Sequence, residues 1–199
     1  MNPNVTVLKK LPLFLGINEK EIDVLLKDMG SRVRSYDKGN FIFYAGDEVH
    51  ALGIVLHGSV HIIQEDYWGN RNILAYIPAG GMFAEAFASL PDARSAVDVM
   101  AVEKSEVLFI NLRYILGGHT TLTESQKTLA ANLLAVLAGK NLVLTEKIRY
   151  MSQRSTRQKL MAYLSHEARK RGKDTFSIEF NRQQLADYLC IDRAAMSTE

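Results

Sequence analysis

The chain has 199 residues, of which 47% are hydrophobic and 23% charged, the composition of an ordinary globular protein. No uninterrupted run of about 18 apolar residues and no signal-peptide pattern occurs, so we expect a cytoplasmic protein without a membrane span. The single cysteine, Cys190, excludes an internal disulfide and a cysteine-ligated iron–sulfur cluster within one chain. The net charge of +2 divides into −2 over residues 1–148 and +4 over residues 149–199, which favours a polyanionic partner for the C-terminal part.

The N-terminal segment, residues 5–29, is predicted to be helical. The apolar segment Leu11-Pro-Leu-Phe14 leads into the helix, and apolar residues at helical spacing follow it. Asn18 followed by Glu21 three positions later is a capping-box pattern, which predicts that a helix begins near Asn18.

From about Ser31 to Leu112 the pattern changes to short β-rich runs. Turn signals separate these runs, among them Asp37-Lys-Gly39, Ala45-Gly-Asp47, His57-Gly-Ser59 and Trp68-Gly-Asn70. We expect about seven or eight strands at roughly 8–12-residue spacing, which indicates an antiparallel sandwich or barrel-like roll. The clearest runs are Phe41–Tyr44, Leu52–Leu56, Val60–Ile63, Ile73–Ile77 and Val107–Ile110.

Residues 122–150 form one long helical pattern without proline. Apolar residues recur at threes and fours, and Lys140 and Asn141 interrupt the stripe. A helix of this length often forms a dimer seam, which we favour over a core helix within one chain. The stripe consists of Leu129, Leu133, Val136, Leu137, Leu144, Ile148 and Met151.

A basic amphipathic helix follows from about Thr156 and ends at Gly172, a plausible C-cap. The alternating segment Thr175–Phe180 is predicted to be a short strand. Residues 181–199 are predicted to form a helix-turn-helix, a motif whose second helix enters the major groove of DNA.

In this motif, Asn181 is predicted to cap the first helix and Asp192 the second. Leu185, Tyr188 and Leu189 supply the apolar face of the first helix. Cys190 lies in the turn, where we expect plain packing of the thiol.

This order of elements resembles the cyclic-AMP receptor/FNR family of bacterial transcription regulators over nearly the whole chain. The turn glycines of Lys38-Gly39, Gly46-Asp47 and Gly58-Ser-Val60 resemble those of the family's β-roll. Gly81-Met-Phe-Ala-Glu85 is similar to its Gly-x-Phe/Ile-Gly-Glu segment. Arg154–Arg157 and Asn181–Leu189 match its first DNA-domain helices.

The implied fold class is α+β with three parts. Residues 1–121 are expected to form an effector-sensing antiparallel β-roll, a double-stranded jelly roll similar to cyclic-nucleotide-binding domains, with N-terminal helices. Residues 122–150 would form the dimerisation helix. Residues 151–199 would form a winged helix-turn-helix that stops inside its recognition helix.

The resemblance also implies a set of effector-site candidates. In family members that bind cyclic nucleotides, the Glu bonds the ribose hydroxyl, an Arg-Ser/Thr pair binds the phosphate, and the long helix supplies a Thr/Ser pair. The candidates here are Phe83, Glu85, Arg94, Ser95 and Thr145, with Leu144 at the first position of that pair. Glu85 could alternatively pair with a neighbouring residue or cap a short helix, and Arg94 could be a surface residue.

Two departures disfavour a cyclic nucleotide. Ala84 replaces a glycine, and its Cβ narrows the ligand cradle. An ungapped alignment puts Ser95 where the family has its phosphate-binding Arg, and on a strand a one-residue slip turns Arg94 to the opposite face. No cofactor is certain. We expect an apolar or anionic effector, with a cyclic nucleotide, haem or no effector as alternatives.

The family pattern implies DNA contacts at both helices of the motif. Arg182 and Gln183 would reach phosphates, while Arg193 suits bidentate bonding to guanine, unless it contacts only phosphate. Ala194, Ser197 and Thr198 follow on the groove-facing side. Double-stranded DNA with a palindromic site, a second copy of the chain and RNA polymerase are the implied partners, and no membrane is.

The expected function is that of an effector-responsive, homodimeric transcription regulator, and the alternative is a truncated ligand-binding sensor without DNA binding. Because the recognition helix stops at Glu199, we expect this chain to dimerise but to bind DNA weakly. No catalytic motif is evident, so we do not expect an enzyme.

Overall fold

A computed structural model of the chain describes residues 5–65, 71–90, 92–116 and 121–199. The chain divides into two compact units. The first, which we call the roll unit, comprises residues 1–64 and 75–139, and the second, the head unit, comprises residues 65–74 and 140–199. Strand β5 (Arg71–Pro78) and helix α5 (Glu124–Met151) each run from one unit into the other.

The roll unit begins with α1 (Val5–Leu8), the short 3-10 helix η1 (Pro12–Phe14) and α2 (Glu19–Asp28). The predicted capping box at the start of α2 is confirmed. The side chain of Asn18 accepts a hydrogen bond from the Glu21 amide at 3.0 Å, and Glu21 Oε2 accepts one from the Asn18 amide at 3.4 Å. These bonds satisfy amides that the first turn of a helix otherwise leaves unpaired.

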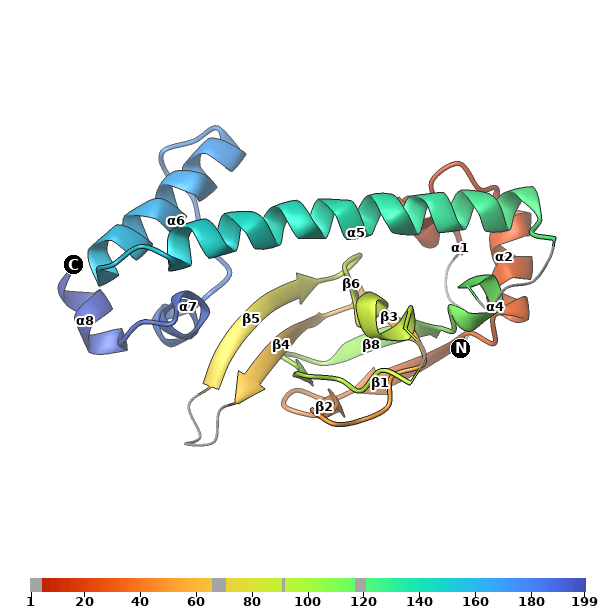
Figure 1. Ribbon diagram of the computed structural model, residues 1–199, viewed down its shortest axis with the longest axis horizontal. Coiled ribbons are helices and arrows are strands. Elements are labelled where there is room, and N and C mark those ends of the chain that lie inside the picture. The colour runs from red at the N-terminus through yellow and green to blue at the C-terminus, as the bar shows by residue number, and fades with distance from the viewer. Residues whose placement is uncertain (1–4, 66–70, 91, 117–120) are drawn as a thin grey trace. The chain divides into compact units, whose positions relative to one another are not determined.

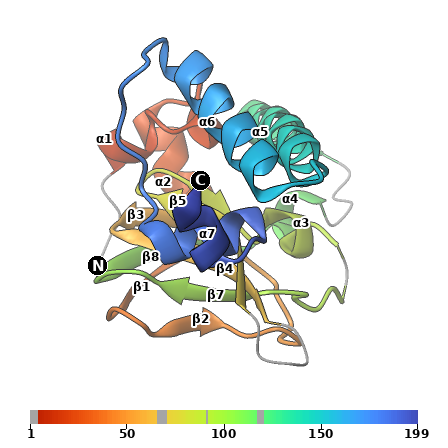
Figure 2. The ribbon, with the colours of Figure 1, turned by 90° about the vertical axis from the view of Figure 1, so that its left-hand side faces the viewer.

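In the described part of the chain, eight strands form two four-stranded antiparallel sheets, which confirms the predicted roll (Figure 1, Figure 2). The first sheet has the order β1-β8-β3-β6 and the second the order β2-β7-β4-β5. The strands are β1 (Arg32–Tyr36), β2 (Phe41–Phe43), β3 (Leu52–His57), β4 (Ser59–Glu65), β5, β6 (Met82–Phe83), β7 (Asp98–Ala101) and β8 (Ser105–Ile110).

The short helices α3 (Glu85–Ala88) and α4 (Arg113–Leu116) follow β6 and β8. Central pairs such as Ile54 with Leu108 carry buried side chains, so the register of β3 and β8 is held by burial on one face. The predicted turn Trp68-Gly-Asn70 lies outside the described residues.

Helix α5 confirms the predicted long helix, and its first half packs within the roll unit. Leu129 and Leu133 are buried in the core that contains α2, and Val136 and Leu137 pack against the same core. Asn132 fixes the contact because its amide donates to the carbonyl oxygens of Leu13 and Leu15 at 3.0 and 2.7 Å.

The apolar stripe predicted as a dimer seam therefore needs correction over its first half. Leu129 and Leu133 face the core of their own chain, because α1, η1 and α2 present an apolar surface that covers them. The exposed apolar residues of α5 are instead Leu134, Leu142, Val143, Leu144 and Ile148.

Among the described residues, α5 is the one helix long and apolar enough to cross a membrane, by length and composition only. One such helix is weak evidence for a span, since helices of soluble proteins pass the same test. Its apolar surface nevertheless needs an explanation, because only 11% of the most apolar window is buried.

The head unit contains the second half of α5 together with α6 (Thr156–Arg171), α7 (Arg182–Leu189) and α8 (Arg193–Thr198). Its core consists of Tyr150, Tyr163, Leu185, Ala186, Leu189 and Met196. The predicted C-cap of α6 is confirmed, because Gly172 has φ +63°, a left-handed conformation that glycine adopts without strain.

The predicted strand Thr175–Phe180 is wrong, because the segment forms no strand. Its alternation has a different cause: Ile178 and Phe180 pack against the helical core, and the Phe180 ring stacks on Tyr188 at 4.8 Å. The Arg171 side chain holds the segment by donating to the Ser177 carbonyl oxygen at 2.8 Å. The backbone of this residue is therefore bonded by a side chain and not by a neighbouring strand.

Candidate functional site

The interior of the roll unit beside β6 is filled by aliphatic and aromatic side chains. Phe83 is fully buried there, 6.1 Å from Phe43 and 6.5 Å from Phe109 between ring centroids. The ring lies directly over Gly53, because a Cβ at that glycine would come within 2.3 Å of Phe83 Cζ. Phe83 therefore fits in this space only because position 53 of β3 is a glycine, which has no side chain.

Ala84 and Glu85 follow at the junction of β6 and α3. Ala84 has φ +63° and ψ 7°, a left-handed conformation that costs an L-residue about 1–2 kcal/mol. Its methyl group belongs to the buried core of the roll. Glu85 is 7% exposed, and its carbonyl oxygen accepts a hydrogen bond from Ser89 Oγ at 2.7 Å. The junction thus keeps a strained alanine beside a buried acid.

Arg94 and Ser95 have opposite surroundings. The Arg94 side chain is 64% exposed and binds the turn at residues 46–48, with bonds of 2.7 Å to Glu48 and 2.9 Å to the Gly46 carbonyl oxygen. Ser95 is 3% exposed, and its hydroxyl donates to the Val97 carbonyl oxygen at 2.6 Å. The guanidinium therefore lies on the surface, and the buried position holds a small hydroxyl.

Thr145, the fifth effector-site candidate, lies in the head unit on the second half of α5. It is exposed, and its hydroxyl donates to the Asn141 carbonyl oxygen one turn earlier at 2.9 Å. The roll unit therefore contains four of the five candidates: Phe83, Glu85, Arg94 and Ser95.

Helices α7 and α8 form the predicted helix-turn-helix with both predicted caps. Asn181 accepts from the Gln184 amide at 2.9 Å, and Asp192 accepts from the Ala195 amide at 2.7 Å. Between the helices, the Ile191 amide donates to the Ala186 carbonyl oxygen at 3.0 Å, as in a Schellman turn. Leu185, Leu189 and Met196 are buried, so the two helices share one core.

Cys190 occupies the left-handed position of this turn, with φ +51°. The expectation that its thiol packs is wrong, because the residue is exposed. The left-handed backbone turns the side chain out of the core, and Leu189 and Met196 fill the interior instead.

The predicted DNA-contacting residues all lie on the exposed side of the motif. Arg182 and Arg193 begin α7 and α8, where unpaired amides and the helix dipole favour negative charge. Gln183 is bonded to Asp187 at 2.8 Å, and Ser197 and Thr198 bond to carbonyl oxygens of their own helix. Exposed residues of the set are Arg182, Gln183, Arg193, Ala194, Ser197 and Thr198.

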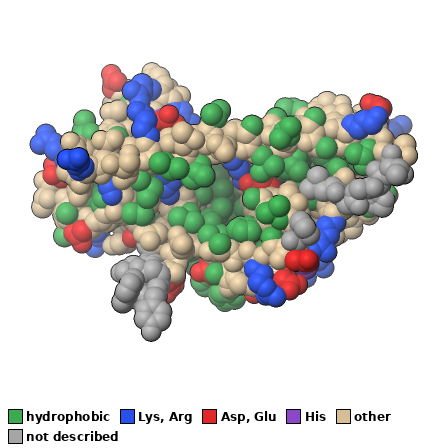
Figure 3. All heavy atoms as spheres, in the orientation of Figure 1, with side chains coloured by type: hydrophobic (Ala, Val, Ile, Leu, Met, Phe, Trp, Pro, Cys, Tyr) green, Lys and Arg blue, Asp and Glu red, His purple; other side chains and the backbone are tan. Residues whose placement is uncertain are grey.

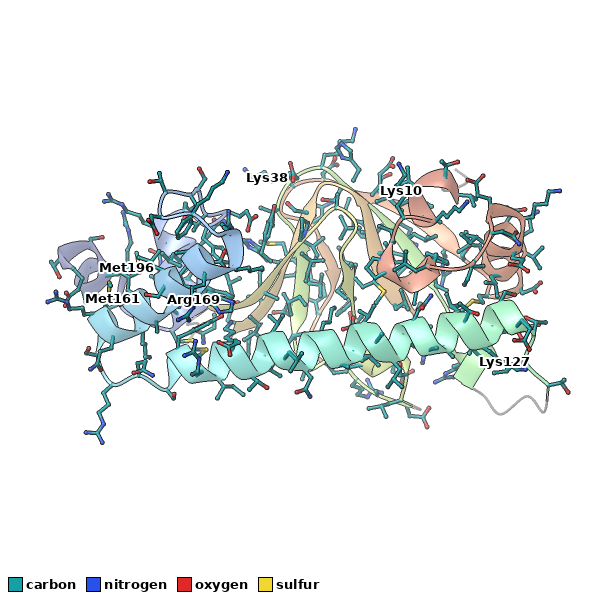
Figure 4. All side chains as sticks on the ribbon, turned by 90° about the horizontal axis from the view of Figure 1, so that it is seen from above. Lys10, Lys38, Lys127, Met161, Arg169 and Met196 are labelled. Carbon is teal, nitrogen blue, oxygen red and sulfur yellow. The ribbon has the colours of Figure 1, made fainter. Side chains whose placement is uncertain are left out.

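Basic side chains also cover α6, as expected from the charge of residues 149–199. Arg157 and Arg169 are exposed, and Figure 4 labels Arg169 on this helix. Figure 3 shows Lys and Arg side chains on the surface of the head helices, together with hydrophobic side chains exposed along α5. The head unit therefore presents both a basic and an apolar surface.

Lys147 is a polar residue of α5 that the sequence analysis did not single out. It is 6% exposed, and its ammonium donates to the carbonyl oxygens of Ile73 and Leu74 at 3.1 and 2.8 Å. Burial lowers the pKa of Lys147 to about 8, an effect that the thiol of Cys190 partly opposes. The sequence signal that could have revealed Lys147 is its spacing from Tyr150. The two residues are three positions apart, so they lie on the same face of the helix, and this face is buried.

Comparisons with known proteins agree with this architecture. Residues 33–117 match the cyclic nucleotide-binding domain family. The chain is 30% identical over 131 residues to the cyclic AMP receptor protein of Thermus thermophilus, and the match covers 66% of this chain and 57% of that protein. The match thus spans little more than half the length of that relative.

Two solved structures extend the likeness into the head unit. The catabolite activator protein of Thermus thermophilus has 25% identity and a TM-score of 0.54, covering 94% of this chain and 84% of that one. The c-di-GMP responsive regulator CLP of Xanthomonas campestris has 19% identity and a TM-score of 0.70, covering 91% and 89%. The second likeness concerns the fold alone. Residues 33–117 thus match the cyclic nucleotide-binding domain family, and the chain is homologous to the cyclic AMP receptor protein of Thermus thermophilus.

Proposed function

We propose that the protein is a cytoplasmic, homodimeric transcription regulator that binds a palindromic DNA site under the control of a small-molecule effector. The observation that carries the proposal is the pair α7–α8, with a shared core and with Arg193, Ser197 and Thr198 exposed along α8. An exposed second helix of this kind fits the major groove.

In the proposed complex the two helices have different tasks. Arg193 bonds guanine O6 and N7, and Ala194, Ser197 and Thr198 lie against neighbouring base edges. Arg182 and Gln183 bind phosphates at the start of α7, which fixes the register of the helices on the duplex. Other exposed basic residues of the head unit strengthen binding to any sequence and make it dependent on salt.

The apolar surface of α5 supports the proposed dimer. Leu134, Leu142 and Ile148 are 69%, 70% and 60% exposed, and they recur along one long helix. A second copy of α5 would remove this surface from water, and it would supply the two-fold symmetry that a palindromic site requires. A membrane is the less suitable occupant, because Lys140 lies in the middle of the helix.

The DNA-binding part is tested by selection from random double-stranded DNA at low salt, where phosphate contacts are strongest. We expect two-fold symmetric sites to be enriched. The Arg193→Ala variant should lose on the order of tenfold in preference at one base pair of each half-site. Arg182→Ala should weaken binding to all sequences by a similar factor, because phosphate contacts do not read sequence.

Arg169→Ala is the matched control, since Arg169 is an exposed arginine of the same unit outside α7 and α8. It should leave the sequence preference unchanged. Absence of any enriched sequence would contradict DNA reading by this chain and would favour the alternative, a ligand-binding sensor that acts without DNA.

The effector of the roll is proposed to be a small molecule without a cyclic phosphate. Three observations support this choice. Arg94 binds Glu48 on the surface, and the Ser95 hydroxyl is bonded to the Val97 carbonyl oxygen of its own turn. Ala84 has a buried methyl group at the position where a glycine would let a nucleotide approach the backbone. The aromatic and aliphatic interior favours an apolar body on the ligand.

Thermal unfolding with added compounds tests this choice. A ligand at a hundredfold excess over its Kd stabilises the folded state by about 2.7 kcal/mol. We expect no stabilisation by cyclic AMP or cyclic GMP, and stabilisation by a member of a panel of small aromatic and anionic metabolites. Stabilisation by cyclic AMP that disappears in Arg94→Ala would overturn the proposal, because it would show that Arg94 turns inward to bind phosphate.

A further inference from the structure

The buried ammonium of Lys147 joins three segments of the head unit. Its Nζ lies 3.1 Å from the Ile73 and 2.8 Å from the Leu74 carbonyl oxygen, both in β5. The same atom lies 3.9 Å from the centroid of the Tyr188 ring in α7. Lys147 itself belongs to α5, so its charged atom links the long helix to a strand and to the first helix of the helix-turn-helix.

The contacts use the full bonding capacity of the ammonium. A lysine has three N–H donors, and here two carbonyl oxygens and the negative face of an aromatic ring surround it. An apolar side chain would fill the same volume without the cost of burying a charge. The lysine is therefore explained by the interactions of its charge rather than by packing.

Tyr188 is held by α5 at both ends. Its ring faces Lys147, and its hydroxyl lies 3.3 Å from the hydroxyl of Tyr150, three residues further along α5. The ring also stacks on Phe180 and meets Tyr163 edge-on at 5.8 Å. The position of α7 in the head unit thus depends on the pair of α5 residues that binds Tyr188.

Strand β5 connects this site to the roll through its own backbone. Arg71–Leu74 belong to the head unit and Ala75–Pro78 to the roll unit. In the second part, Ile77 packs against the roll core that includes Phe83. Ile77 is three residues from Leu74, about 10 Å along a strand, so a shift of Ile77 along the strand is transmitted to the carbonyl oxygens that bind Lys147.

We propose that Lys147 is a positioning residue that couples β5 to α7, and so transmits the state of the roll to the helices that read DNA. While the carbonyl oxygens of Ile73 and Leu74 stay in place, the ammonium is held under the Tyr188 ring and α7 is fixed. When β5 moves, the ammonium loses two of its three partners and releases Tyr188. The inference rests on the proposed function, since it assigns the regulation of α7 and α8.

Hydrogen exchange of the full chain, followed by mass spectrometry, tests the coupling without DNA. Tyr188→Leu removes the aromatic face from Lys147. In the wild-type background it should raise amide exchange in residues 71–76 on the order of tenfold, the effect of weakening a charged interaction. In a Lys147→Met background the same substitution should leave the exchange of residues 71–76 unchanged, because the connecting charge is already gone.

Two controls separate coupling from general loosening. Tyr163→Leu removes a neighbour of Tyr188 that does not contact the ammonium, so it should raise exchange in α6 and α7 but not in residues 71–76. Lys127→Met makes the same change on the same helix at an exposed lysine, labelled in Figure 4, whose partner is Glu124. Exchange of residues 71–76 that responds equally to Tyr188→Leu in both backgrounds would overturn the proposal.

A second comparison does not require Lys147→Met to fold. Lys147→Arg retains a charge that does not titrate, so coupling should persist at pH 9.5, where the wild-type chain should lose it. Both are compared in a Cys190→Ser background, which removes the nearby thiol. Tyr150 and Tyr188 stay neutral there because burial raises the pKa of both phenols. Coupling that persists in the wild-type chain at pH 9.5 would overturn the proposal, and neither result depends on DNA binding.

Discussion

Gly53→Ala is expected to destabilise the roll by about 3 kcal/mol, the upper end of the usual cost of overpacking a core. A Cβ at this position would lie 2.3 Å from Phe83 Cζ and 2.7 Å from both Cε atoms. The ring has no free direction in which to move, because Phe83 is fully buried between Phe43 and Phe109. Urea unfolding followed by circular dichroism measures the loss.

Two further variants test the cause of this loss. Phe83→Leu in the Gly53→Ala background should recover part of the stability, since leucine lacks the ring atoms that meet the new Cβ. Gly139→Ala is the matched control, because a Cβ there meets nothing within 4 Å. In the interior of α5 this change should stabilise the chain by about 0.5–1 kcal/mol. Gly53→Ala with wild-type stability would refute the described packing of Phe83.

The second large effect is a dependence of head-unit stability on pH. Burial lowers the pKa of Lys147 from 10.5 to about 8, so between these values the unfolded chain binds more protons than the folded one. Stability should therefore rise with pH from about 8 to 10.5, by about 3 kcal/mol if Lys147 acts alone. Stability from this source is lost as the pH falls through 8.

The rise should end near pH 10. Burial raises the pKa of Tyr150, Tyr163 and Tyr188, and hydrogen bonding between Tyr150 and Tyr188 adds to the effect on Tyr150. Stability from these phenols is complete below their unfolded pKa of about 10 and declines above it. Urea midpoints measured from pH 7 to 11 should show a maximum, and Lys147→Met should remove the rising side. A rising side that persists in Lys147→Met would assign it to another group.

Much of the fold could be predicted from local patterns. The caps at Asn18, Asn181 and Asp192 were correct because a capping bond depends on side chains within three residues. The roll followed from the spacing of turns and strands. The strand expected at residues 175–180 failed because alternation shows only that every second side chain is buried, and here a helical core buries Ile178 and Phe180.

The site was less accessible to sequence reasoning because it depends on contacts between distant residues. The outward position of Arg94 follows from its bond to Glu48, 46 residues away. The apolar stripe of α5 could not show which half faces its own chain, because that depends on how α2 packs. Lys147 was missed since its partners, Ile73, Leu74 and Tyr188, are backbone and aromatic groups far along the chain.

Because α5 is one continuous helix, a small tilt at one end produces a larger displacement at the other end. Its 28 residues form a rod about 42 Å long at 1.5 Å per residue. If one end of such a rod is held, a tilt of about 5° carries the other end roughly 4 Å, more than the length of a hydrogen bond. A tilt of only a few degrees at one end of α5 is therefore enough to make or break hydrogen bonds at the other end.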